Sequence, residues 1–223
     1  MKVINVAIDG PAGAGKSTIS RKAAAELGFI YIDTGALYRT VGLNALRKGA
    51  DINDPASVIA TLTDDLKVEL RFIDGEQRMF LCGEDVSDKI RTPEVSSAAS
   101  KTSAVPEVRK FLFDLQKQLA KENNCIMDGR DIGTVVLPDA DVKIFLTATP
   151  EARAERRYLE LKEKGMDVKY EDVLSDMIKR DYDDSHRAIA PLKQADDAVL
   201  ADTSGITLEQ SIDLIINIIK ERI

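Results

Sequence analysis

The sequence predicts an α/β fold in which a five-stranded parallel sheet is flanked by helices and carries a small antiparallel β-containing insert and a helical lid. Short apolar runs alternate with helical patterns along most of the chain. A glycine-rich loop follows the first apolar run, and one polar–apolar alternation interrupts the series. With 223 residues, of which 44% are hydrophobic, the chain suits one domain with a substantial core.

The glycine-rich segment at 10–18 fits the phosphate-loop pattern G-x-x-x-x-G-K-[S/T]. Its glycines let backbone N–H groups surround a polyphosphate, because no Cβ is in the way. Lys16 would contact the β- and γ-phosphates of ATP, and Ser17 would ligate Mg²⁺. An apolar strand at 3–8 precedes the loop and a helix from Ser17 to Leu27 follows, as in P-loop NTPases. The predicted ATP-binding residues here are Gly10, Pro11, Ala12, Gly13, Ala14, Gly15, Lys16, Ser17 and Thr18.

A second apolar strand at 29–32 runs into a helix for which Thr34 is a candidate cap. Ligand-binding groups gather at the carboxyl ends of parallel strands, so Thr34, Tyr38 and Arg39 are candidates for contact with an acceptor. A capped surface helix with a solvated arginine explains the same pattern equally well. Alternating residues on either side of Asp74-Gly75 then predict an antiparallel hairpin in an insert at about 64–104.

A helix is expected from Pro106, because apolar residues recur there at helical spacing. Arg109 lies beside this apolar stripe, and we expect it to reach toward a cleft rather than to be buried. The next strand ends at Asp128, where an acid in a phosphate-loop fold typically orients the metal. A plain Asp-Gly turn would explain Gly129 but not the Arg130-Asp131 pair that follows it.

A fourth strand at 142–146 leads to a helix with Thr149 as N-cap and Pro150 at N1. Arg153 and Arg157 lie four residues apart on one face of this helix, where like charges repel. Either a bound triphosphate or salt bridges to neighbouring glutamates would relieve that repulsion. The charged stretch at 162–172 predicts a mobile lid between two helices.

The second lid helix leads to Arg180, Asp184 and Arg187, which share one face, whereas His186 is assigned no role. A fifth strand at 198–201 precedes a capping box, Thr207-x-x-Gln210, and a last helix with an apolar stripe.

Composition narrows the class of partner. The formal charge of −7 argues against a sequence-independent grip on nucleic acid or an anionic membrane. No apolar run reaches the ~20 residues that span a bilayer, so a cytoplasmic protein is expected. Cys82 and Cys125 match neither a zinc site nor a C-x-x-C pair, and both are expected to be buried, inert thiols.

The dispersed arginines suggest a site that brings two anions together. Transfer of a γ-phosphoryl group to another phosphate is the economical interpretation, because an acceptor that is already ionised needs no general base. Arginines and Mg²⁺ would stabilise the charge that spreads over the transferring group. The arginines concerned are Arg39, Arg109, Arg130, Arg153, Arg156, Arg157, Arg180 and Arg187.

Over essentially its whole length the chain resembles the bacterial-type cytidylate (CMP) kinases within the nucleoside monophosphate kinases. The motifs that carry the resemblance are the phosphate loop, D-T-G-A-L-Y-R at 33–39, G-E-D-V at 83–86, I-R-T at 90–92, D-G-R-D-I-G-T-V-V at 128–136 and R-A-I-A-P-L at 187–192. The resemblance implies transfer from ATP to CMP or dCMP by a monomer. It also implies a core at 1–33, 105–150 and 190–223, a monophosphate-binding region at 34–104 and a lid at 151–189.

Residue roles follow from the resemblance by position. Arg39 and Arg130 would hold the acceptor's phosphate, with Thr34 and Tyr38 lining its pocket. Ser100, Arg109 and Asp131 would recognise cytosine, with Asp131 toward the exocyclic amine. Arg180 and Asp184 would contact the ribose, and Arg187 the acceptor. The residues assigned to catalysis are Lys16, Arg130, Arg157, Arg180 and Arg187, those assigned to ATP beyond the loop are Arg153 and Arg157, and those assigned to the metal are Ser17 and Asp128.

Two features leave alternatives open. Family members often have glycine where this chain has Ser17, so either Ser17 or Thr18 could supply the hydroxyl for Mg²⁺. A kinase of UMP or of a small metabolite such as shikimate would share the loop and the lid. A GTP-dependent switch would need an N-K-x-D guanine motif, which the sequence lacks. A purely structural nucleotide-binding module would not need the lid arginines.

Overall fold

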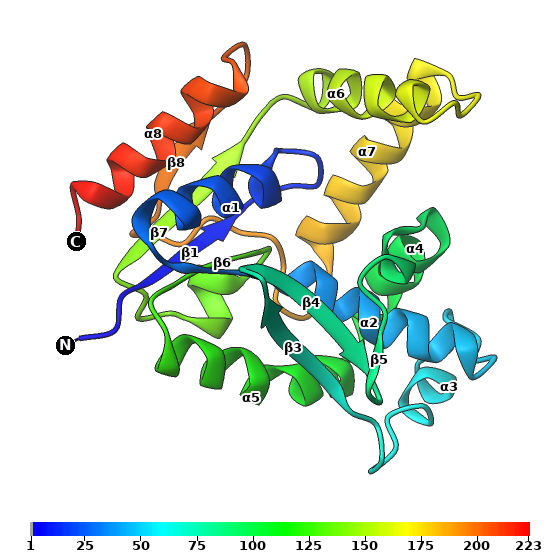
Figure 1. Ribbon diagram of the computed structural model, residues 1–223. Helices are drawn as coiled ribbons and strands as arrows, with labels where there is room; N and C mark the ends of the chain where they lie inside the picture. The colour runs from blue at the N-terminus through cyan, green and yellow to red at the C-terminus, as the bar shows by residue number, and fades with distance from the viewer. Residues whose placement is uncertain (1) are drawn as a thin grey trace. The chain divides into compact units, whose positions relative to one another are not determined.

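The computed structural model describes residues 2–223, and their contacts divide the chain into two units (Figure 1). The first unit comprises residues 2–31 and 122–223, and the second comprises residues 32–121. This grouping places helix α5 (Pro106–Glu122) almost wholly in the second unit. The reason is its apolar stripe, because Val108 and Leu112 are buried among side chains of the second unit.

A five-stranded sheet forms the centre of the first unit, with strand order β2-β6-β1-β7-β8. Parallel ladders join β6 to β1, β1 to β7 and β7 to β8. The strand before the phosphate loop is therefore central, with β6 and β7 on its two sides. The five-stranded parallel sheet predicted from the sequence is confirmed. The strands are β1 (Asn5–Asp9), β2 (Ile30–Asp33, which leads into the second unit), β6 (Cys125–Gly129), β7 (Val142–Thr147) and β8 (Val199–Asp202).

Helices α1 and α8 pack against each other and against the sheet (Figure 1). Their contact is apolar, since Ile19 and Ala23 of α1 and Ile212 and Ile216 of α8 belong to one buried cluster. The predicted capping box at Thr207 begins α8. The helices of the first unit are α1 (Lys16–Leu27), the π-helix η2 (Ile132–Val136), α6 (Pro150–Glu163), α7 (Tyr170–His186) and α8 (Leu208–Lys220).

Helices α6 and α7 form a helical hairpin (Figure 1). Its core is small, with Ala154 and Leu161 of α6 packed on Val173 and Met177 of α7. Thr149 caps α6 and Pro150 opens it, as the sequence predicts. This segment has few apolar contacts, so its polar anchors carry much of its attachment to the unit.

The second unit combines helices with a three-stranded antiparallel sheet of order β3-β4-β5, which confirms the predicted insert. Its hairpin turns at Asp74 and Gly75, whose φ angles of 52° and 79° suit a tight turn. Helices α2 and α4 approach so closely that a Cβ on Gly42 would lie 2.9 Å from the Ala99 nitrogen. The elements are α2 (Thr34–Arg47), α3 (Pro55–Ile59), β3 (Val68–Ile73), β4 (Glu76–Leu81), β5 (Glu84–Asp85), the 3-10 helix η1 (Lys89–Arg91), α4 (Pro93–Thr102) and α5.

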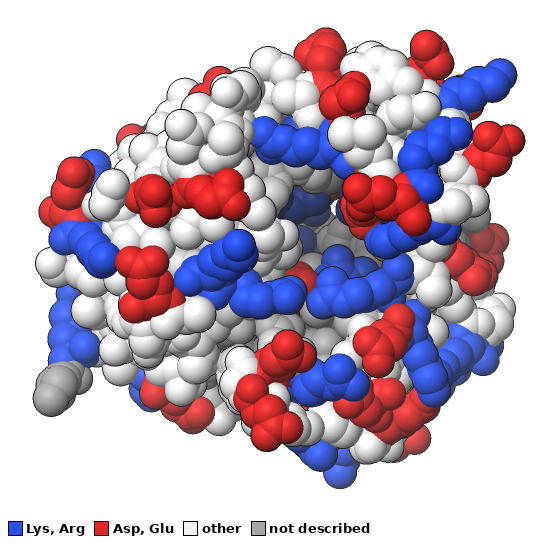
Figure 2. Space-filling model, turned by 45° about the horizontal axis from the view of Figure 1, so that its top comes forward, with Lys and Arg blue, Asp and Glu red and all other residues white. Residues whose placement is uncertain are grey.

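Surface features bear on three expectations from composition. Acidic and basic side chains are interspersed on the face drawn in Figure 2. Within residues 2–223, no helix combines the length and the apolarity needed to cross a membrane. Both thiols are free, and the structure corrects the expectation for Cys82: it is exposed because it lies in the tight turn after β4, with φ 49°. Cys125 is buried, and burial raises its thiol pKa to about 12.

Candidate active site

The phosphate loop connects the central strand β1 to helix α1. A Cβ on Gly10 would lie 1.9 Å from the carbonyl oxygen of Leu146 on β7, so glycine is required there. Gly13 and Gly15 adopt φ angles of 75° and 88°, which also favour glycine. Gly15 is the N-cap of α1 and has no side chain to accept hydrogen bonds from the first turn. The first-turn N–H groups are thus suited to an anion.

Lys16 is buried inside this loop, and its Nζ donates hydrogen bonds to the carbonyl oxygens of Gly10, at 2.7 Å, and Pro11, at 2.8 Å. Burial lowers the pKa of Lys16 to about 7, and the positive charge of Arg130 acts in the same direction. The carboxylate of Asp128 partly opposes this shift. A phosphate group at the loop would favour the charged lysine and would raise its pKa again.

Ser17 and Asp128 are brought together although they lie far apart in the sequence. The Ser17 hydroxyl donates to one oxygen of Asp128 at 3.0 Å, and the Tyr31 hydroxyl donates to the other at 3.2 Å. A hydroxyl beside a carboxylate is the kind of oxygen pair that Mg²⁺ prefers. No group of three or more potential His, Cys, Asp or Glu metal ligands occurs within residues 2–223. The Ser17 hydroxyl and the Asp128 carboxylate are oxygen donors that fit Mg²⁺.

Asp9, at the end of β1, is a site residue that the sequence analysis missed. Its two carboxylate oxygens accept hydrogen bonds from the backbone N–H groups of Ile132, at 2.8 Å, and Gly133, at 2.7 Å. Burial raises the Asp9 pKa to about 6, although these hydrogen bonds oppose the shift. Asp9 thereby fixes the segment that directly follows Arg130 and Asp131. An acid at the end of the central strand, directly before the loop, was the available signal.

Two ion pairs connect the segment after β6 with the end of α7. The Nε of Arg130 donates to Asp184 at 2.7 Å, and Nη2 of Arg187 lies 3.3 Å from Asp131. Arg187 follows the last turn of α7 and also donates to the Ala190 carbonyl at 2.6 Å. Although burial acts to raise the pKa of Asp184, the Arg130 charge holds it below its ordinary value. The structure thus brings together four of the predicted acceptor residues.

The arginines of α6 have separate surroundings. Arg157 pairs with Glu160 at 2.7 Å, as the salt-bridge alternative predicts. Arg156 donates to the Thr203 carbonyl at 2.8 Å. Arg153 is 2% exposed and pairs with Asp181 of α7, a residue that the sequence analysis did not single out. Contact of Arg153 and Arg157 with a triphosphate stays a prediction.

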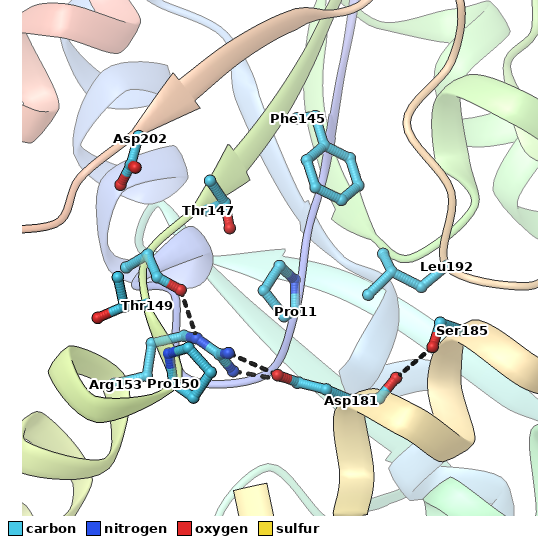
Figure 3. A pocket seen from close by; sticks show the side chains of 11 residues that line it. Pro11, Phe145, Thr147, Thr149, Pro150, Arg153, Asp181, Ser185, Leu192 and Asp202 are labelled. Atoms are coloured by element: carbon cyan, nitrogen blue, oxygen red, sulfur yellow. Dashed lines mark hydrogen bonds and ion pairs between the residues drawn. The ribbon is translucent and has the colours of Figure 1, made fainter. Parts of the chain in front are cut away.

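A pocket of about 420 Å³ opens beside the phosphate loop in the first unit (Figure 3). Figure 3 shows Arg153 and Asp181 facing each other at one side of it and the Phe145 ring at another. Backbone and side chains from both the loop and the α6–α7 hairpin contribute to its wall. The lining residues are Pro11, Phe145, Thr147, Ala148, Thr149, Pro150, Arg153, Asp181, Ser185, Leu192 and Asp202.

In the second unit, Thr34, Tyr38 and Arg39 lie on the first turns of α2. The predicted cap at Thr34 is wrong, because Asp33 is the N-cap and accepts from the Ala36 N–H at 2.9 Å. An aspartate one residue earlier competes for the same role. Arg39 Nη2 donates to Asp33 at 2.8 Å, whereas its buried Nε has no hydrogen-bond partner among the described residues. That unsatisfied donor fits a phosphate-binding role.

The expectation that Arg109 reaches toward a cleft rather than being buried is wrong, because only 9% of its surface is exposed. Its guanidinium lies 5.6 Å from the centre of the Tyr38 ring, and its Nη1 donates to the Ser103 carbonyl at 3.4 Å. The aromatic ring covers the cation, and the sequence pattern did not reveal that contact. Ser100 is half-buried on α4. His186 is exposed as expected, and its ring stacks on Tyr182 at 4.0 Å.

Comparison with known proteins gives a consistent result. The family model described as cytidylate kinase matches residues 6–221. A cytidylate kinase of Caldicellulosiruptor bescii is 50% identical, over 98% of this chain and 96% of the relative. One of Syntrophotalea carbinolica is 48% identical, over 97% of this chain and 92% of the relative. A solved structure of an uncharacterized protein from Eubacterium ventriosum superposes with TM-score 0.56 at 16% identity, over 99% of this chain and 100% of that one, and supports the fold alone.

Proposed function

The chain belongs to the cytidylate kinase family, and we propose that it transfers the γ-phosphoryl group of ATP to CMP or dCMP, giving ADP and CDP or dCDP. The observation that carries this proposal is a phosphate loop whose Ser17 contacts Asp128, in a chain matched along nearly its whole length by cytidylate kinases. The resemblance further implies that the enzyme acts as a cytoplasmic monomer. We also retain the three-region division into core, monophosphate-binding region and lid as part of the proposal.

The donor nucleotide is assigned to the phosphate loop. The N–H groups at 13–18 and the Lys16 ammonium neutralise the β- and γ-phosphates, and Lys16 exchanges its two carbonyl partners for phosphate oxygens. Arg157 would leave Glu160 for the triphosphate, because that salt bridge is partly exposed and therefore weak.

Ser17 and Asp128 are assigned to Mg²⁺. The hydroxyl and the carboxylate oxygen supply hard ligands, directly or through water, and Thr18 remains the alternative hydroxyl. When bound, Mg²⁺ neutralises charge on the β- and γ-phosphates. Tyr31 keeps the second oxygen of Asp128 occupied and so orients the carboxylate.

The roles toward the acceptor are those that the family resemblance implies, residue by residue. In the first unit, Arg130 binds its phosphate, Arg180 and Asp184 bind the ribose, and Asp131 accepts from the exocyclic amine of cytosine. In the second unit, Arg39 binds phosphate through donors that include the unsatisfied Nε. Arg109 and Ser100 contact cytosine, and Thr34 and Tyr38 line the pocket.

The chemistry needs little beyond position and charge. An oxygen of the acceptor's phosphate forms a bond to the γ-phosphorus while the bond to the β–γ bridging oxygen breaks, and ADP leaves. With a second pKa of about 6, the acceptor's phosphate is largely ionised at neutral pH, so no side chain has to remove a proton. Lys16, Arg130, Arg157, Arg180 and Arg187 stabilise the negative charge that spreads over the transferring group.

A coupled assay of ADP release with ATP and Mg²⁺ tests the proposal on CMP, dCMP, UMP, AMP, GMP and shikimate. We expect turnover with CMP and dCMP alone. Absence of turnover with every nucleotide would overturn the acceptor assignment, and turnover of shikimate would favour the small-metabolite kinase. Equal turnover of UMP and CMP would reject the recognition of the exocyclic amine by Asp131.

A further inference from the structure

Arg153 donates hydrogen bonds to three protein partners, of which Figure 3 shows Asp181. Its Nε donates to the Ala148 carbonyl at 2.8 Å, and Nη1 donates to the Ala12 carbonyl of the phosphate loop at 2.9 Å. Nη1 and Nη2 also form a bidentate pair with the two oxygens of Asp181 at 3.0 and 2.5 Å. Four of the five N–H groups of a guanidinium are used in this way. Arg153 is therefore poorly placed to serve as a ligand for phosphate.

Helix α7 also touches the phosphate loop through an apolar contact. A Cβ added to Gly13 would lie 3.1 Å from Cε of Met177 and 3.4 Å from Cβ of Arg153. Met177 and Asp181 are four residues apart, so they lie on the same face of α7. One face of α7 therefore packs against the phosphate loop through Met177, and the ion pair between Asp181 and the buried Arg153 holds it there.

The same helix carries groups assigned to the acceptor. Arg180 precedes Asp181 directly, and Asp184 follows it by three residues and bonds to Arg130 at 2.7 Å. A change in the position of α7 would therefore move Arg180 and Asp184 relative to the phosphate loop. The bidentate geometry matters here, because a fork of two parallel hydrogen bonds fixes direction as well as distance.

We propose that Arg153 and Asp181 form a positioning pair. The pair fixes the position of α7 relative to the phosphate loop and thereby aligns Arg180 and Asp184 for phosphoryl transfer. Neither member contacts the nucleotides. The inference rests on the proposed function and reassigns Arg153, which the family resemblance assigned to ATP. A misplacement of about 1 Å can cost on the order of 100-fold in rate, so a pair remote from the reacting atoms can still control kcat.

A double-mutant cycle of Arg153→Ala and Asp181→Ala tests the proposal, with kcat, KM for ATP and KM for CMP measured well below each Tm. We expect each single variant and the double variant to lose kcat by a similar factor, on the order of 10- to 100-fold, since either change removes the same pair. KM for ATP should stay within about twofold in all three variants, because no nucleotide contact is lost.

Other outcomes would overturn it. A rise in KM for ATP confined to the Arg153 variants would make Arg153 a nucleotide ligand. Multiplicative losses in the double variant, or unchanged kcat in every variant, would reject coupling through α7. If the alanine variants do not fold, Arg153→Lys with Asp181→Asn repeats the cycle. Arg153→Lys keeps the charge but loses the fork, so it should lose kcat as well.

The matched control is Asp183→Asn on the same helix. Asp183 pairs with Lys179 four residues earlier, and both side chains are more than half exposed. Because an exposed pair contributes little, kcat should not change. Failure of the proposed function would appear as absence of CMP turnover in the unmodified protein, and is thus distinguishable from failure of this inference.

Discussion

Ser17 and Asp128 of the first unit are in hydrogen-bond contact across 111 residues of sequence, whereas Arg39 of the second unit bonds to Asp33 across only six. The same contrast holds for Arg153, which reaches Ala12 across 141 residues, and for Arg109, which reaches Ser103 across six. In these four examples, the hydrogen bonds of the first unit join distant segments, whereas those from Arg39 to Asp33 and from Arg109 to Ser103 in the second unit are local.

This contrast has functional consequences. A substitution in the first unit disturbs several interlocked groups, so it should lower the rate of transfer. A substitution in the second unit affects one locally held group, so it should weaken binding of the acceptor and leave the donor unaffected. Substitutions in each unit therefore test whether the two sets of residues differ in this way.

The largest effect is expected from Lys16→Ala in the first unit. Loss of the ammonium from the phosphate loop should lower kcat by about 1,000-fold, because a preorganised charge on the transferring group is lost. Tm should change by only a few degrees, since the buried amine is itself costly to desolvate, as its pKa of about 7 indicates. Steady-state kinetics and thermal unfolding measure the two quantities. Lys22→Ala, at an exposed position of α1, is the control; retained turnover in Lys16→Ala would reject the phosphate-loop assignment.

Asp131→Ala should change the ratio of kcat/KM values for CMP and UMP by about 10- to 100-fold, the value of a hydrogen bond to a charged group. Both substrates should also share a loss, because Asp131 accepts from Arg187 at 3.3 Å. Arg187→Ala measures that shared loss. In this variant the ratio of the kcat/KM values for CMP and UMP should not change. Equal losses on CMP and UMP in Asp131→Ala would reject base recognition by this carboxylate.

Arg39→Lys is the corresponding test in the second unit. Lysine keeps the charge near Asp33 but loses the planar fork, so KM for CMP should rise by about tenfold. KM for ATP should not change if the local contacts of α2 act on the acceptor alone. Arg47→Lys on the same helix is the control, because Arg47 pairs with Glu84 at the surface. A parallel rise in KM for ATP would contradict the expectation that substitutions in the second unit affect the acceptor alone.

The same contrast explains what the sequence could predict. Elements with local signals were predicted, among them the five strands, the caps at Thr149 and Thr207, and the hairpin at Asp74-Gly75. The Asp128 strand end was also predictable, because the phosphate-loop pattern makes an acid on an adjacent strand meaningful. Its role at the metal stays a prediction, and the structure shows its contact with Ser17.

Contacts between distant segments were not predictable in this way. Nothing local links Arg153 to Asp181, or Asp9 to the backbone at Ile132, because each pairing depends on how strands and helices pack. Arg109 shows the same limit, since helical periodicity placed it beside the apolar stripe but could not reveal the covering Tyr38 ring. The prediction of the α2 N-cap was wrong for a different reason. Asp33 and Thr34 are both good N-cap residues, and Asp33 is the one that caps the helix.

The smallest effect should appear in the pH dependence of donor binding. Lys16 has a pKa of about 7 in the protein, and bound phosphates would raise it. Well below pH 7 the lysine is protonated in both states, so its contribution to affinity is constant. Above pH 7 binding must take up a proton, so affinity for ATP should fall by about fivefold from pH 7 to 8.

Calorimetry with Mg²⁺ and ATP in two buffers of different ionisation enthalpy measures both the affinity and the proton uptake. Lys16→Met is the control, because it keeps the titration of the nucleotide itself and removes that of the lysine. Guanidinium groups stay charged throughout this range, so the Arg39 contribution to CMP binding should not vary with pH. Equal proton uptake in the two proteins would show that Lys16 is already charged before the nucleotide binds, and the loop would then be preorganised in charge as well as in shape.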